Sequence, residues 1–190
     1  IGKENVVLVL GDNFFYGQNL TEKLKKIIKL KSGSKVFLHP VRNPNLYGVA
    51  TVNKKNKILK IIEKPKKTKS NLAVTGLYFF DNRVVKHSKS LKFSKRKELE
   101  ITDLLNIYRK KNELTAEFIG RGGAWLDTGN IKDYYNASNF ISTLEERQGL
   151  KIGCLEEISY RNKWIGKKEI AKALKFYGNC DYSRYLRDLI

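Results

Sequence analysis

The sequence predicts an α/β fold, and three features of its N-terminal part carry that prediction. Val6–Leu10 is a short, wholly apolar run rich in β-branched residues, which is typical of a buried strand in a parallel sheet. From Leu20 to Leu30 apolar residues recur at the spacing of a helix with one buried face. Lys35–His39 has the composition of a second strand, which Pro40 ends. Strand, helix and strand in this order predict a right-handed crossover within a parallel sheet.

The middle of the chain is rich in β-structure. Three segments have the composition of strands: Gly48–Val52, Ile58–Glu63 and Ala73–Phe80. Asn53–Lys57 separates the first two with turn-forming residues, which predicts a hairpin. Ile101–Lys111 follows with helical spacing, and Leu114–Ile119 predicts one more strand.

The C-terminal part is predicted to be helical. Asn130 is placed to cap a long helix that runs to about Arg147, and Gly149 is placed to end it. The positions expected to face inward in this helix are Tyr134, Ala137, Ile141 and Leu144. Three shorter helices are expected around Glu156–Arg161, Lys168–Phe176 and Tyr182–Asp188. We therefore expect an α/β domain over residues 1–150 and a C-terminal helical segment over residues 151–190.

The composition restricts the function classes. The net charge of +19 raises the possibility of a nucleic-acid binder. However, the basic residues are mostly scattered lysines without an Arg-rich stripe and stacking aromatics, so we expect no nucleic-acid partner. A positive field also attracts anionic substrates such as nucleotides and sugar phosphates. No apolar run has the length of a membrane span, so we expect no membrane partner. Cys154 and Cys180 are too few for a disulfide framework, which favours a reducing compartment and a cytoplasmic location.

Two carboxylates are candidates for a metal site. Asp12 follows the predicted strand Val6–Leu10, at the sheet edge where ligands bind in open α/β sheets. Asp127 lies at a predicted strand-to-helix junction. Each acid alone is equally consistent with a turn or a helix cap. Together they match the usual way of holding Mg²⁺, which takes one or two carboxylates plus substrate phosphates.

A second candidate group is Glu63-Lys64-Pro65 at the end of a predicted strand. A carboxylate here can accept hydrogen bonds from sugar hydroxyls, and an ammonium offers a point charge to a phosphate. From spacing alone, an exposed ion pair is the better interpretation. Gly48 and Gly76 allow close approach of a ligand to the backbone, but each is also compatible with an ordinary strand.

Taken together, the segments resemble glucose-1-phosphate thymidylyltransferases. The matching blocks occur in the order of that family from about Val6 to the end of the chain: VLGDNFFYG, LYGVATV, IIEKP, KSNLAVTGLYFFDN, ELEITDLLNIY, GRGGAWLDTG, ASNFISTLEERQGLK and CLEEISYR. The ELEITD, WLDTG and ERQGLK blocks are specific to this enzyme, whereas GD and EKP occur throughout the wider superfamily of sugar nucleotidyltransferases.

The resemblance implies a Rossmann-like nucleotidyltransferase sheet and a reaction in which dTTP and glucose 1-phosphate give dTDP-glucose and diphosphate. It implies Mg²⁺ as cofactor, with Asp12 and Asp127 as its ligands and with Asp12, Lys64 and Asp127 as the catalytic residues. The substrate-binding residues implied beside Asp12 are Gly48, Glu63, Lys64, Val74 and Trp125. The family also has a regulatory site for dTDP-sugars, which matches Tyr16, Gly17, Gly120, Arg121, Cys154, Glu157, Ile158 and Arg161. It further implies a homotetramer and a place at the first step of dTDP-rhamnose and deoxysugar biosynthesis, which supplies lipopolysaccharide O-antigen and other polysaccharides.

The chain departs from the family pattern at its beginning. The family's Gly-rich phosphate loop, with its Arg and Lys, has no counterpart before Val6, and the chain begins at Ile1 without a methionine. We therefore expect a fragment that lacks the nucleotide-binding unit and is inactive alone. Smaller departures are Lys97 in place of Gly and Leu155 in place of Pro. The alternatives left open are a UTP-using glucose-1-phosphate uridylyltransferase and a non-catalytic remnant that binds nucleotide sugars.

Overall fold

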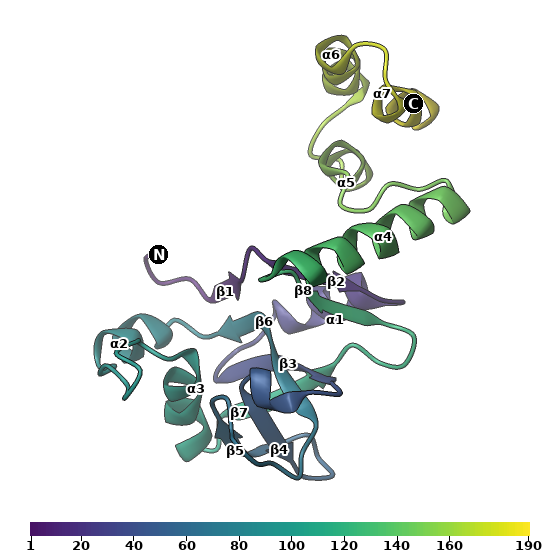
Figure 1. The fold of residues 1–190 in the computed structure, drawn as a ribbon. Helices are drawn as coiled ribbons and strands as arrows, with labels where there is room; N and C mark the ends of the chain where they lie inside the picture. Colours follow the sequence, from purple (N-terminus) through teal and green to yellow (C-terminus); the bar gives the residue numbers. More distant parts are fainter. The chain divides into compact units, whose positions relative to one another are not determined.

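A computed structural model describes all residues, 1–190, and they form two compact units, Ile1–Asp133 and Tyr134–Ile190 (Figure 1). The boundary therefore lies before most of the long helix rather than after it at residue 150, where the sequence placed it. One reason is Glu145 near the end of that helix. Its carboxylate accepts hydrogen bonds from the Ile152 backbone N–H at 2.8 Å and from Lys151 Nζ at 2.6 Å, which ties the helix to the C-terminal segment.

The first unit contains the strands and three of the α-helices. The strands are β1 (Val6–Val9), β2 (Asn13–Tyr16), β3 (Ser34–Pro40), β4 (Val49–Val52), β5 (Ile58–Ile62), β6 (Leu72–Phe80), β7 (Leu114–Phe118) and β8 (Ala124–Asp127). The helices are α1 (Leu20–Ile27), the 3₁₀ turn η1 (Pro44–Leu46), α2 (Val84–Lys89) and α3 (Ile101–Lys110). The predicted strands and helices are all present, and α2, β2 and the 3₁₀ turn are additional.

The main sheet is mixed, with the long strand β6 at its centre. β3 pairs with β6 along one side, while β1 and β4 share the other side, and all three pairs are antiparallel. β7 pairs with β3 in parallel, and the β4–β5 hairpin, closed by the predicted turn at Asn53–Lys57, forms the opposite edge. The prediction of a parallel sheet was therefore wrong. β1 and β3 do run in the same direction, but β6 lies between them in the opposite one.

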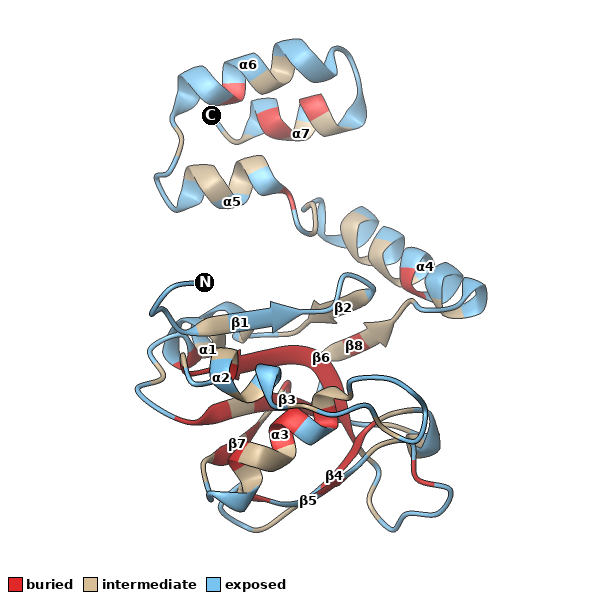
Figure 2. Cartoon of the chain, turned by 90° about the vertical axis from the view of Figure 1, so that its left-hand side faces the viewer, coloured by how far each residue is buried: buried red, intermediate tan, exposed pale blue.

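Side chains of β3 and β6 alternate between two buried faces. Val36 and Tyr78 belong to a cluster that α2 and α3 complete, whereas Phe37 and Phe79 belong to a second cluster with α1 and Trp125. Because both faces are covered, these central strands are apolar along their whole length. Figure 2 shows the buried residues concentrated on β3 and β6.

β1 contradicts the prediction of a buried strand. Val7, Leu8 and Val9 are exposed by 46%, 38% and 54%. The reason is its position, since β1 pairs only with the C-terminal half of β6 and has no second neighbour in the sheet. An apolar run alone does not distinguish a strand covered on both faces from such an exposed one.

β2 and β8 form a separate two-stranded antiparallel ribbon. The register pairs Asn13 with Asp127 at one end and Tyr16 with Ala124 at the other. Sequence patterns did not predict this ribbon, because residues 11–13 were interpreted as a loop. The ribbon brings together two segments that are far apart along the chain.

The second unit contains the C-terminal helices. These are α4 (Ile131–Gln148), which begins in the first unit, and α5 (Leu155–Arg161), α6 (Lys167–Tyr177) and α7 (Asp181–Asp188). Cys154, Ile170 and Leu186 form the small core between α5, α6 and α7. Gly149 ends α4 as predicted, with a positive φ of 65°. The prediction that Tyr134 faces inward was wrong, because it is 63% exposed, whereas Ala137 is buried. None of the helices is both long and apolar enough to span a bilayer.

Candidate functional site

The two predicted acids lie beside each other in the first unit. Asp12 occupies the turn between β1 and β2, and Asp127 is the last residue of β8. A methyl group built on Gly129 would lie 3.2 Å from Asp127 Oδ1 and 3.4 Å from Asp12 Oδ2. One point in space is thus close to both carboxylates, and the missing side chain of Gly129 leaves that point open.

Backbone contacts hold the two acidic segments together. The Thr128 N–H and the Thr128 Oγ1 hydroxyl both donate to the Asp12 carbonyl oxygen, each at 2.8 Å. The Gly129 N–H donates to Asp127 Oδ1 at 3.1 Å. Together with the pairing of Asn13 and Asp127, these bonds hold the two acidic segments at a fixed distance from each other.

The donor set fits a hard divalent cation. Two carboxylates offer oxygen ligands, which is what Mg²⁺ prefers, and substrate phosphates and waters usually supply the rest. No group of three or more His, Cys, Asp or Glu residues suitable for a metal occurs in the chain. A site at Asp12 and Asp127 would therefore depend on the substrate for further ligands. The metal role of both residues stays a prediction.

A cavity of about 190 Å³ opens beside Asp127. It is lined by Leu10, Asn13, Leu46, Tyr47, Gly48, Glu63, Lys64, Val74, Gly76, Tyr78, Ile101, Thr102, Trp125 and Asp127. Every residue that the sequence suggested for the sugar-phosphate pocket is among them, apart from Asp12, which lies next to Asn13. The cavity joins the residues just before β4 and just after β5 with β6, α3 and the β2–β8 ribbon.

Glu63 is a second carboxylate that lines the cavity, besides Asp127. Its Oε2 lies 3.2 Å from the position of a methyl group built on Gly48, so the glycine gives the carboxylate room. Burial is the largest cause that raises the pKa of Glu63 above its ordinary 4.5, and the Glu100 carboxylate adds to it. Lys64 and Arg96 act in the opposite direction.

Lys64 follows Glu63, and its backbone leaves the extended conformation of the strand. Its φ is 38°, in the left-handed region, and its backbone N–H donates to the Tyr47 carbonyl at 3.1 Å. The turn ends the strand after Ile62, and Lys64 becomes part of the cavity lining. A flexible, exposed ammonium there is suited to a phosphate.

Two residues that the sequence reasoning missed connect the cavity to the acids. Tyr47 packs edge-on against Trp125, with ring centroids 5.0 Å apart. Burial, followed by the charges of Asp127 and Asp133, raises the pKa of Tyr47. Asn13 contacts Asp12 and Trp125 through its side-chain amide. The only sequence signal for Asn13 was its place immediately after Asp12.

The residues suggested for a regulatory site fall into two groups, one in each unit. In the first unit, Tyr16 is the last residue of β2 and Gly17 follows it, and a methyl group on Gly17 would lie 3.4 Å from the Gly123 Cα. Gly120 and Arg121 belong to the loop between β7 and β8 and line a cavity of about 380 Å³ with Leu38, His39, Pro40, Phe118, Gly122 and Gly123. These four predicted residues thus lie at the far end of the ribbon from the acids.

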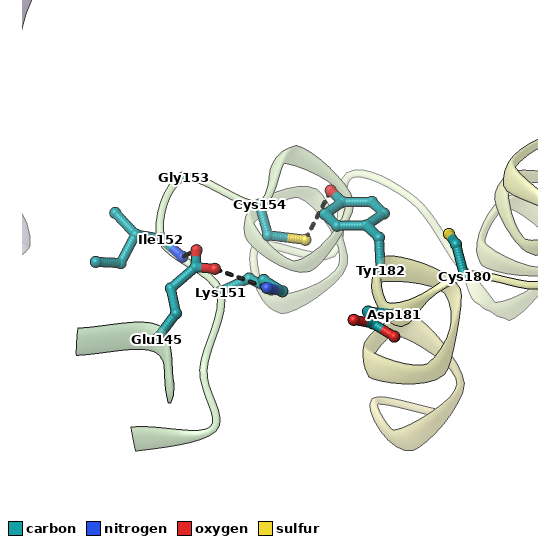
Figure 3. A pocket seen from close by; sticks show the side chains of 8 residues that line it. All are labelled: Glu145, Lys151, Ile152, Gly153, Cys154, Cys180, Asp181 and Tyr182. Carbon is teal, nitrogen blue, oxygen red and sulfur yellow. Dashed lines mark hydrogen bonds and ion pairs between the residues drawn. The ribbon is translucent and has the colours of Figure 1, made fainter. Parts of the chain in front are cut away.

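In the second unit, Cys154, Glu157, Ile158 and Arg161 lie at or on α5. Cys154 caps the helix by accepting a hydrogen bond from the Glu157 N–H, and Arg161 Nε donates to Glu157 Oε1 at 2.6 Å. Cys154 also lines a cavity of about 650 Å³ and contacts Tyr182 Oη at 3.1 Å (Figure 3). The regulatory role of both groups stays a prediction.

Comparisons with known proteins agree with the geometry of the first unit. The profile of the nucleotidyl transferase family matches residues 1–143. The chain belongs to the nucleotidyl transferase family. This nucleotidyl transferase is 44% identical over 190 residues to a glucose-1-phosphate thymidylyltransferase of Neisseria meningitidis serogroup A, and 41% identical to one of Mycobacterium tuberculosis. Each alignment covers 100% of this chain and 66% of the relative.

Solved structures show the same nucleotidyl transferase fold. A Bacillus anthracis protein described as a glucose-1-phosphate thymidylyltransferase, in complex with a sucrose, matches with 39% identity and a TM-score of 0.64. That match covers 73% of this chain and 55% of the other. A UDP-glucose pyrophosphorylase complexed with UDP-glucose matches with 26% identity and a TM-score of 0.66, covering 75% and 58%. The predicted fold class is confirmed.

Proposed function

We propose that this chain belongs to an Mg²⁺-dependent enzyme that converts dTTP and glucose 1-phosphate into dTDP-glucose and diphosphate. The observation that supports it most directly is the convergence of Asp12 and Asp127 at Gly129, beside a cavity that holds Glu63 and Lys64. A carboxylate pair for a divalent cation and a polar cavity for a sugar phosphate are the two parts that such a reaction needs.

In this proposal glucose 1-phosphate occupies the cavity of about 190 Å³. The Glu63 carboxylate accepts hydrogen bonds from the sugar hydroxyls, while Lys64 contacts the phosphate. Trp125 and Val74 provide apolar walls that orient the sugar ring. The phosphate then faces the side of the cavity where Asp127 lies.

The chemistry needs no general base. A phosphate oxygen of glucose 1-phosphate attacks the α-phosphorus of dTTP, the bond from that phosphorus to the bridging oxygen breaks, and diphosphate leaves. The attacking monoester is largely ionised at neutral pH because its second pKa is about 6. The residues therefore act mainly by holding the two reacting groups in line. Mg²⁺, held by Asp12 and Asp127, supplies charge neutralisation at the phosphates when bound.

The preference for dTTP over UTP is supported by sequence similarity. Relatives with 41–45% identity over the whole chain are named thymidylyltransferases, whereas the UDP-glucose pyrophosphorylase structure is 26% identical. Assays with both nucleotides in parallel test this choice. Activity with UTP alone would replace the thymidylyltransferase assignment by a uridylyltransferase.

The proposal extends to regulation and assembly. dTDP-sugars bind at the predicted regulatory residues described above, and the enzyme is a cytoplasmic homotetramer. Its product dTDP-glucose enters dTDP-rhamnose and other deoxysugar synthesis for surface polysaccharides. The support for these finer statements is the resemblance to thymidylyltransferases.

Glu63→Gln tests the sugar-binding part of the proposal. We expect the Kd for glucose 1-phosphate, measured by isothermal titration calorimetry, to rise by about tenfold or more, because charged hydrogen bonds are worth about 1.5–3 kcal/mol. We expect no loss of Tm at pH 7. The pKa of Glu63 is raised on folding, so its ionised form is disfavoured in the folded state, and neutral Gln removes that disadvantage.

Glu98→Gln is the matched control. Glu98 also pairs with Arg96, at 3.0 Å, but it is 57% exposed and does not line the cavity. This variant should bind glucose 1-phosphate like the unmodified chain. An unchanged Kd in Glu63→Gln, or an equal rise in both variants, would remove Glu63 from the proposed sugar site.

A further inference from the structure

Asn13 makes three hydrogen bonds that join the acid pair to the cavity. Its Oδ1 accepts from the Trp125 indole Nε1–H at 2.6 Å and from the Gly76 backbone N–H at 2.9 Å. Its Nδ2 donates to Asp12 Oδ1 at 2.8 Å. One amide thus contacts a candidate metal ligand, a cavity wall and the central strand β6.

These bonds determine which way the amide points. An indole N–H and a backbone N–H can only donate, so both require the oxygen of the amide. The nitrogen must then lie on the other side, where the Asp12 carboxylate accepts from it. A flipped amide would place the two N–H donors against the amide N–H₂ and leave the amide carbonyl oxygen facing the Asp12 carboxylate oxygen.

The surrounding backbone is shaped to admit this side chain. A methyl group built on Gly76 would lie 2.5 Å from Asn13 Oδ1 and 2.9 Å from Leu10 Cβ. No residue with a side chain could take that position without displacing the amide. Asn13 is also the residue of β2 that pairs with Asp127 across the ribbon. Its own position is therefore fixed from two sides.

We propose that Asn13 is a positioning residue that orients the Asp12 carboxylate for divalent-cation binding. The two donors hold the amide oxygen, so the amide nitrogen presents a fixed hydrogen bond to one oxygen of Asp12. That bond leaves the other oxygen, Oδ2, directed to the space beside Gly129. This inference rests on the proposed metal role of Asp12.

A double-mutant cycle with Mn²⁺ tests the proposal without turnover. The Kd of Mn²⁺ is measured by electron paramagnetic resonance for the unmodified chain, Asn13→Ala, Asp12→Ala and the double variant. We expect Asn13→Ala to raise the Kd by about tenfold, the low end for loss of a partner that orients a metal ligand. In the Asp12→Ala background the same change should alter the Kd less than twofold, because the carboxylate that it orients is gone.

The cycle distinguishes the metal role of Asp12 from the positioning role of Asn13. If Asp12→Ala leaves the Kd unchanged, the metal role of Asp12 fails. If Asp12→Ala weakens binding but Asn13→Ala does not, or if Asn13→Ala weakens it equally in both backgrounds, only the positioning role is overturned.

Asn53→Ala is the matched control for removing an asparagine. Asn53 Oδ1 also accepts two backbone N–H groups, from Lys55 and Lys57, but it lies in the β4–β5 turn and does not line the cavity. Its Mn²⁺ affinity should be unchanged. The amide orientation has its own readout, since the chain has only two tryptophans. Asn13→Ala should shift the indole N–H resonance that Trp125→Phe removes, and an unshifted resonance would contradict the Trp125–Asn13 bond.

Discussion

Replacing Asp127 by Asn is expected to lower kcat for diphosphate release by more than about 100-fold, and Asp12→Asn should do the same. Even residues that only orient a metal ligand contribute about 10–100-fold, so loss of a ligand should cost more. The fold should be preserved. Asn keeps an oxygen that can accept from the Gly129 N–H, and Thr128 bonds to the Asp12 backbone rather than to its carboxylate.

The measurement compares kcat at saturating Mg²⁺ with Tm for each variant, made in a full-length form that includes the nucleotide-binding unit. Asp188→Asn serves as control, because that exposed carboxylate on α7 lies outside the candidate site. It should keep the full rate. A near-normal rate in either Asp12→Asn or Asp127→Asn would exclude that residue from the metal site.

Asp81→Asn should destabilise the first unit by about 2 kcal/mol, as expected when a buried, fully hydrogen-bonded carboxylate is replaced by a group that cannot accept all of its bonds. Asp81 is buried, and its Oδ2 accepts from the Gly33 N–H and from Arg83 Nη2, while Oδ1 accepts from the Tyr108 hydroxyl at 3.0 Å. The N–H groups can only donate, and the Arg83 backbone N–H also donates to Oδ1, at 3.1 Å. An amide N–H₂ in place of either oxygen would therefore face a donor.

The same carboxylate should contribute to the acid sensitivity of the fold. Burial acts to raise the pKa of Asp81, but hydrogen bonds from Arg83, Gly33 and Tyr108 outweigh it and hold the pKa below its ordinary 3.8. A lowered pKa gives stability that is present above the unfolded value and is lost as the pH falls through the folded one. The difference in unfolding free energy between the unmodified chain and Asp81→Asn should thus shrink below about pH 4.

Urea unfolding at pH 7 and pH 3 checks both statements. Glu22→Gln is a suitable control, because Glu22 forms only an exposed pair with Lys25 on α1 and should change stability by less than about 1 kcal/mol. A loss in Asp81→Asn no larger than in this control would show that the buried network contributes little.

Sequence patterns predicted the helices and strands in which apolar residues recur at the regular spacing of a buried face. The α1 and α3 helices and the strands β3 to β7 were found in this way, because one or both of their faces are packed in the core. β1 shows the limit of the method. Its apolar residues are exposed, and its partner β6 lies far along the chain, so neither its burial nor its antiparallel pairing was readable from Val6–Leu10 itself.

The site residues that belong to family motifs were predicted from the sequence. The site residues whose roles arise only from contacts in the folded chain were missed. Glu63, Lys64 and Trp125 line one cavity as expected. Asn13 and Tyr47 were missed, because their roles arise from contacts with residues distant in sequence, such as Trp125. Pairing between β2 and β8 brings Asn13 close to Trp125, and a four-residue strand such as NFFY carries too little pattern to predict that pairing.

The ribbon of β2 and β8 restricts how many residues this segment can contain more than it restricts which residues they are. Successive residues of a strand point to opposite faces, so inserting or deleting one residue between Asp12 and Tyr16 would turn the following side chains to the wrong side and remove Asn13 from its place opposite Asp127. Chain length in this segment should therefore be fixed, while exchanges among its aromatic residues should be tolerated far more readily.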